Sequence, residues 1–305
     1  MRLAEIERHV SSMRELGHLV GAMRAVASMH MQEAVRALSG VREYGKAMSE
    51  AVREALAIAA EEAPVAPDGA NAAQRRGGQR VIVLFTSEHG FVGGFNERLL
   101  EAAAQGRATT DQLLIVGSRG AALASERGLR AASVHAMATR LGSIPEIVRR
   151  IQEALYASLA RGEFGRAEVL FGGHRRGGAA AIERRQLFPL AIPLAKARGS
   201  RLTALHTLPA AELLERLTGE YMLSQLMEAA AESLAAENGA RFAAMDAAHD
   251  NLTRKLDKLR LDASRARQEE VTTELLDLLT GEEAQPPEST TTRKSAAAVT
   301  AAAEP

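Results

Sequence analysis

The two ends of the chain carry apolar residues at the spacing of an amphipathic helix. Near the C-terminus steps of four and three residues hold one stripe against a partner helix: Met245, His249, Leu252, Leu256, Leu259, Ala263 and Ala266. A similar stripe opens the chain: Leu3, Ile6, Val10, Met13, Leu16, Val20, Met23 and Ala27. No proline precedes Pro64 and none lies between Pro209 and Pro286, so neither helix is interrupted. We therefore predict a long antiparallel coiled coil formed by the two termini.

Between these helices, strand patterns alternate with helical patterns. Strands are predicted at 81–87, 113–118, 167–174 and 183–190, with a further short one near 131–136. Such alternation is typical of a largely parallel sheet, so the chain is predicted to be an α+β protein with an inserted Rossmann-like α/β domain. The predicted parts are a coil helix at 1–60, a linker at 61–80, the α/β domain at 81–207, a coil helix at 208–284 and a disordered tail at 285–305.

Composition excludes several classes of function. Lys plus Arg and Asp plus Glu both number 38, which gives no argument for nucleic acid, and aromatics make up only 3%. Cysteine is absent, which excludes disulfides and thiolate metal sites. No apolar run reaches the length of a membrane-spanning helix, so we expect no such helix in this chain.

A glycine-rich turn, GFVGGFN at 90–96, is the best candidate for a phosphate-binding loop. Its spacing matches neither the dinucleotide fingerprint nor the lysine-containing phosphate loop. Two basic loops, at 75–78 and 172–178, lack interleaved aromatics and are interpreted as solvated. We expect no catalytic residue, no cofactor and no metal, because the eight histidines form no ligand motif.

Polar residues gather near the end of the C-terminal helix. Arg265, Arg267, Gln268, Thr272 and Glu274 lie within ten residues of one another. They form either a solvated helix face or a docking site in which the forked guanidinium and the amide bind loops of a partner.

Four segments together resemble the gamma subunit of the F-type ATP synthase. They are AMRAVASMHMQEA at 22–34, TSEHGFVGGFN at 86–96, RFAAMDAAHDN at 241–251 and RARQEEVTTELLDLLTGEEA at 265–284. The Arg-Gln-x-x-Val-Thr-x-Glu pattern from Arg267 to Glu274 is the most specific part of the resemblance.

The resemblance implies a non-catalytic central rotor stalk that couples ion translocation to ATP synthesis or hydrolysis. Its implied partners are the alpha and beta subunits, the epsilon subunit and the membrane c-ring, at the cytoplasmic face of a bacterial membrane, with membrane association only through the complex. Position by position, Arg267 and Gln268 match a polar pair that contacts a beta subunit, with Thr272 and Glu274 beside it, and Met23 matches a coil methionine. Gly90, Gly93, Gly94 and Asn96 match a structural turn.

The chain also departs from the family pattern. His30 and Met31 stand where a lysine is usual, and Ala263 and Ser264 stand where Tyr-Asn is usual. We interpret these departures as a divergent branch, such as the alternative F-type ATPase that some bacteria carry.

Two other interpretations use the same residues. A coiled-coil scaffold or adaptor with no link to ATP would need only the paired helices. An α/β enzyme would need the turn at 90–96 to bind a nucleotide.

Overall fold

The computed structural model describes residues 3–62, 79–175, 181–190 and 206–283. Most of the predicted linker and all of the predicted tail at 285–305 therefore lie outside the described residues. The chain divides into a first unit, which combines the segments up to Glu15 and from Thr253, and a second unit from Leu16 to Leu252. Each unit is described by itself.

A five-stranded sheet forms the centre of the second unit. The strands are β1 (Arg80–Phe85), β2 (Gln112–Val116), β3 (Ser133–His135), β4 (Arg166–Gly173) and β5 (Ala181–Phe188), in the order β3-β2-β1-β4-β5. The first four run parallel, with Val83 opposite both Leu114 and Val169, and β5 pairs antiparallel to β4. The predicted, largely parallel sheet is confirmed.

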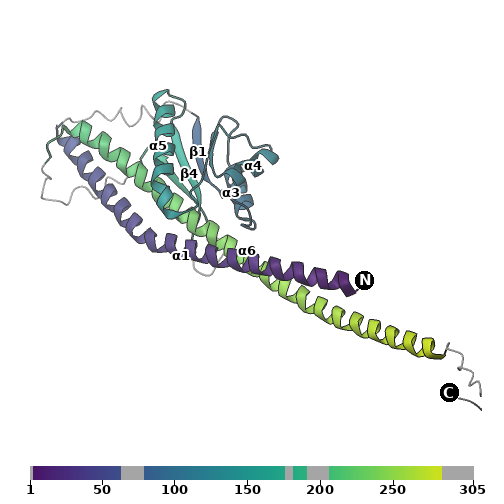
Figure 1. Cartoon of the computed structure of the whole chain (residues 1–305). Coiled ribbons are helices and arrows are strands. Elements are labelled where there is room, and N and C mark those ends of the chain that lie inside the picture. Colours follow the sequence, from purple (N-terminus) through teal and green to yellow (C-terminus); the bar gives the residue numbers. More distant parts are fainter. Residues whose placement is uncertain (1–2, 63–78, 176–180, 191–205, 284–305) are drawn as a thin grey trace, which may run out of the picture. The chain divides into compact units, whose positions relative to one another are not determined.

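Helices cover both faces of this sheet (Figure 1). α3 (Phe95–Ala104) and α4 (Ser118–Glu126) cover the face that carries Ile82 and Leu84, whereas α5 (Ile144–Ala160), preceded by the short η1 (Leu141–Ser143), covers the opposite face. Successive strand residues point to opposite faces, so strands buried on both sides are apolar throughout. This explains why VIVLF at 81–85 is fully buried.

Two long helices, α1 (Leu3–Glu62) and α6 (Ala210–Glu283), begin and end the described chain. In the second unit, α6 packs beside α5 on the sheet through Met222, Leu226, Ala229, Ala230 and Leu234, and α1 contributes Ala34 and Leu38 to the same core. The run of small residues on α6 allows its backbone to lie close to the sheet. No helix among the described residues is long and apolar enough to cross a membrane.

The residues of the predicted stripes on α1 and α6 are buried or partly buried, with one exception. Ile6 and Val10 of the first unit and Met245 of the second are buried, but Leu16 is 45% exposed. The prediction that Leu16 belongs to the buried stripe was therefore wrong. Leu16 is the residue that follows a second consecutive step of three along the predicted stripe.

Candidate partner-binding and turn sites

An open surface depression lies on the last turns of α6, in the first unit. It is lined by Arg265, Gln268, Glu269, Thr272 and Thr273. The hydroxyl of Thr272 donates to the backbone carbonyl oxygen of Gln268 at 2.7 Å, and both residues are exposed. Two of the predicted contact residues, Gln268 and Thr272, are thus brought onto one face.

Arg267 lies on a different face of the same helix. Its guanidinium donates to a carboxylate oxygen of Glu7 at 2.6 Å, and the two side chains are 66% and 50% exposed. An ion pair this exposed contributes at most about 1 kcal/mol, so a partner can replace it at little cost. Glu274 is seven residues away and therefore shares this face. Met23 lies in the second unit, where it is half-buried.

Exposed apolar side chains follow these polar residues. Val271, Leu275, Leu276 and Leu278 are each about half exposed or more. Large apolar side chains that gather at one place on a surface typically mark a contact with another protein. The sequence analysis missed this feature, although the letters LLDLL at 275–279 at the end of a charged helix were a usable signal.

The predicted glycine turn joins β1 to α3. Gly93 has a φ of 53° and Phe91 a φ of 62°, and Gly94 caps the first turn of α3. A left-handed backbone is rare for an aromatic residue, and the side chain of Phe91 is 67% exposed. The buried Asn96 accepts the backbone N–H of Ser87 at 3.0 Å and donates to its hydroxyl at 2.8 Å.

Glu88 anchors the start of this turn. Its carboxylate accepts the backbone N–H and the hydroxyl of Ser118, at 3.1 and 2.7 Å, and the backbone N–H of Met137 at 2.8 Å. Burial raises the pKa of this carboxyl, but the hydrogen bonds together outweigh burial and leave it below its ordinary value. The N-terminus of α4, a place where α/β domains often bind an anion, is therefore occupied by a side chain of the protein itself.

Arg241 of α6 holds the same turn from the other side. It donates to Glu237 at 2.6 Å and to Asn238 at 3.0 Å, and it points at the carbonyl oxygens of Gly90 and His89 at 3.4 and 3.5 Å. Glu237 is almost fully buried, and burial raises its pKa to about 7 although the charge of Arg241 opposes this. The sequence analysis assigned no role to Glu237, although its spacing of four residues to Arg241 was visible.

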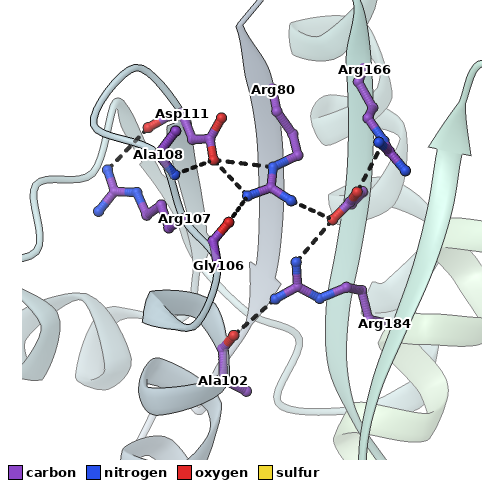
Figure 2. Close-up of polar contacts among 9 residues, drawn as sticks. Arg80, Ala102, Gly106, Arg107, Ala108, Asp111, Arg166 and Arg184 are labelled. Carbon is purple, nitrogen blue, oxygen red and sulfur yellow. Dashed lines mark hydrogen bonds and ion pairs between the residues drawn. The ribbon is translucent and has the colours of Figure 1, made fainter.

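A second ion network closes the opposite edge of the sheet, at the N-terminal ends of β1 and β4 (Figure 2). The buried Glu168 accepts from Arg80, Arg166 and Arg184 at 3.0 to 3.4 Å. Arg80 also donates to Asp111 at 2.6 Å. Burial raises the pKa of the Asp111 carboxyl, but the hydrogen bonds from Arg80 and from the backbone N–H of Ala108, with the charge of Arg80, together leave it below its ordinary value. The network joins three strands and the loop before β2, and we interpret it as structural.

The remaining candidates from the sequence are the two basic loops and a metal site. The basic loop at 75–78 lies outside the described residues, as do residues 176–178 of the other loop. Among the residues that the structure describes, no three histidine or carboxylate side chains are placed to hold a metal ion.

The chain matches known proteins over almost its whole length. A family model described as ATP synthase matches residues 2–285. The chain is 28% identical over 292 residues to the ATP synthase gamma chain of Geobacter metallireducens, with 92% of this chain and 98% of that protein covered. It is 26% identical over 289 residues to the ATP synthase gamma chain of Geotalea daltonii, with the same coverage.

A solved structure has the same fold. It is a chain of the mitochondrial ATP synthase of Euglena gracilis, from a structure of OSCP, F1 and c-ring in rotational state 3. It superposes with a TM-score of 0.62 at 13% identity, with 95% of this chain and 99% of that chain covered. Since the family model spans residues 2–285, the chain belongs to the ATP synthase family, among the gamma subunits that the sequence resemblance indicated.

Proposed function

We propose that the chain is the central rotor stalk, the non-catalytic gamma subunit, of an F-type ATP synthase or ATPase. The observation that carries this proposal is the family match over residues 2–285, together with relatives that are named as gamma chains. The fold supports it, since a long helix at each end of the described chain flanks an α/β domain. The stalk carries torque and performs no chemistry of its own.

In this proposal α1 and α6 form an antiparallel coiled coil. Within the second unit, Arg24 pairs with Asp246, Arg42 with Glu232, and Tyr44 with Glu220. The residue numbers on α6 decrease as those on α1 increase, which is the pattern of antiparallel helices. Within the first unit, Glu7 pairs with Arg267. These contacts support the division of the chain into coil helices at 1–60 and 208–284 around a domain at 81–207.

The end of α6 is the proposed contact with the catalytic hexamer of alpha and beta subunits. Gln268 and Thr272 present one polar face, and Arg267 and Glu274 present another, so a beta subunit meets different groups as the stalk turns. Met23 of α1 is proposed to contact the same hexamer. Such differential contact selects among the conformations of each beta subunit and therefore among their nucleotide states.

The α/β domain is the proposed binding site for the epsilon subunit and the membrane c-ring. Association with the cytoplasmic face of a bacterial membrane then occurs only through the complex. The turn containing Gly90, Gly93, Gly94 and Asn96 has a structural role in this proposal. The internal ligand supplied by Glu88 argues against nucleotide binding by the domain itself.

Simultaneous replacement of Arg267 and Gln268 by Ala tests the proposed contact. In the reconstituted complex, we expect ATP-driven ion pumping to fall several-fold while the circular dichroism of the purified chain is unchanged. Arg260→Ala is the matched control, because it removes an exposed arginine, paired with Asp257, from the same helix. Unchanged pumping in the double variant would remove the assigned role. Failure of the wild-type chain to co-purify with alpha and beta subunits would overturn the rotor proposal.

A further inference from the structure

Two glutamates of α6 lie between α1 and the sheet. Glu228 and Glu232 are separated by one helical turn, and their side chains are only 14% and 4% exposed. Like charges at this spacing repel, and buried carboxylates are costly unless they are paired. Each therefore needs a cation from a neighbouring element.

Two arginines from different elements supply the opposite charges. Arg42 of α1 donates to Glu232 at 2.5 Å and lies 3.5 Å from Glu228, so it bridges both carboxylates. Arg185 of β5 donates to Glu228 at 3.0 Å, and its guanidinium lies 5.2 Å from the centre of the Phe171 ring. The charges alternate from β5 through α6 to α1.

Backbone and amide groups complete this arrangement. The backbone N–H of His174, at the end of β4, donates to the second oxygen of Glu232 at 3.3 Å, and Arg185 also donates to the side chain of Gln225 at 3.0 Å. Gly45 is buried on α1 and faces Ser224 and Gln225, so the two helix backbones lie close together at this level. Of these contacts, the bridge made by Arg42 and the close approach at Gly45 depend on the axial position of α1.

Apolar packing alone does not define that position. The residues of α1 that reach the core here, such as Ala34 and Leu38, make contacts without direction, which define the axial position less sharply than hydrogen-bonded charges do. A slide of α1 by one turn, about 5.4 Å, breaks the bridge made by Arg42, because it carries the guanidinium away from one of its two carboxylates. Polar groups between paired helices can set register in this way, and here the carboxylates are largely buried while the side chain of Arg42 is 53% exposed.

We propose that Arg42, Arg185, Glu228 and Glu232 form a register lock, which fixes α1 axially along α6 and ties both helices to β5. The lock is a property of the chain itself. Its consequence, that the α/β domain and the paired helices of the second unit turn as one body, rests on the proposed rotor function. These four residues are positioning residues.

Distances between spin labels on the purified full chain measure the register. The sequence contains no cysteine, so pairs of introduced cysteines label cleanly. Labels at the exposed Ala47 of α1 and Ala243 of α6 measure the position of α1 along α6. Labels at Ala47 and at the exposed Arg119 of α4 measure the position of α1 relative to the α/β domain. With the wild-type network, we expect one narrow distance distribution for each pair.

Two variants separate register from folding. Arg42→Gln leaves Glu232 buried without its cation, and this variant is expected to broaden both distributions at least twofold or to add a population displaced by about 5 Å. The double variant R42M/E232M removes both charges while it keeps apolar volume, so it is expected to unfold at no lower urea concentration than the wild type. It should nevertheless show the same broadening.

Two controls remove other contacts between the same helices. Tyr44→Phe removes the hydrogen bond to Glu220, and Arg24→Gln removes the single, partly exposed pair with Asp246. Both are expected to keep the narrow distributions. The proposal is overturned if R42M/E232M stays as narrow as the wild type, or if the controls broaden as much as the network variants.

A measurement on the complex tests the mechanical consequence. With R42M/E232M we expect the number of ions pumped per ATP hydrolysed to fall by half or more. If the wild-type chain neither assembles nor pumps while the distances still broaden in the variants, the lock stands and the rotor function fails. If the complex works and the distances do not change, the lock fails and the rotor function stands.

Discussion

Replacement of Glu237 by Gln is expected to change how the stability of the chain depends on pH. Burial raises the pKa of this carboxyl from 4.5 to about 7 in the folded chain. Between these values the folded state holds a proton that the unfolded state has released, so the stabilising contribution is fully present below about pH 4.5 and is lost as pH rises through about 7. Glutamine has the same shape and does not titrate, so the stability of the variant lacks this decrease with rising pH.

The size of the effect follows from the two pKa values. At about 1.4 kcal/mol for each pH unit, the wild type should lose roughly 2 to 3 kcal/mol of unfolding free energy relative to Glu237→Gln between pH 5 and pH 8. Urea titrations of the purified full chain, followed by far-ultraviolet circular dichroism at both pH values, measure this difference. All other titrating groups are common to both proteins and cancel.

Glu212→Gln is the matched control. Glu212 forms the same pairing of a glutamate with an arginine four residues later on α6, with Arg216 at 2.7 Å, but both side chains are largely exposed. Its removal should change the unfolding free energy by about 0.5 kcal/mol or less at either pH. If the difference between wild type and Glu237→Gln varies by less than about 0.5 kcal/mol from pH 5 to pH 8, the argument from burial is refuted.

Three substitutions and one control test the packing around the turn, each by urea unfolding of the purified chain. Gly120→Ala should destabilise by about 3 kcal/mol, because a Cβ there would lie 2.0 Å from the hydroxyl oxygen of the buried Thr86, and a cost below about 1 kcal/mol would contradict this. Asn96→Ala should cost about 2 to 3 kcal/mol, since it leaves a buried backbone N–H unpaired, and an unchanged midpoint would show that the bond contributes nothing. Gly93→Ala should cost about 1 kcal/mol because of its positive φ, whereas Gly90→Ala, whose Cβ would enter open space, should be nearly neutral; equal effects would contradict the assignment.

The helices and strands of this fold could be predicted from local patterns of apolar residues. The contacts that could not be predicted join residues far apart in the sequence. The strand at 81–85 and the helix at Ala210–Glu283 follow from apolar runs and periodicity, which depend on neighbours within a few residues. Leu16 was misassigned because it was placed by spacing alone, and spacing does not report whether a neighbouring element covers a side chain. Arg42 and Glu232 are 190 residues apart, so no local rule joins them.

The candidate sites divide in the same way. The segment from Arg267 to Glu274 was visible through its resemblance to a family, and its contact role stays a prediction. The helix geometry that sends Arg267 and Gln268 to different faces follows from the 100° step and was available from the sequence. The pKa of Glu237 was not, because it depends on how fully the surrounding elements exclude water from the carboxyl.

The carboxylate of Glu88 gives the α/β domain an anion that cannot dissociate. Domains of related architecture often change stability when a phosphate group arrives at or leaves this position, because the ligand binds only the folded state. Here that contribution is covalently attached and constant. The folded α/β domain therefore needs no dissociable anion at the N-terminus of α4, and its stability does not depend on the concentration of such a ligand there.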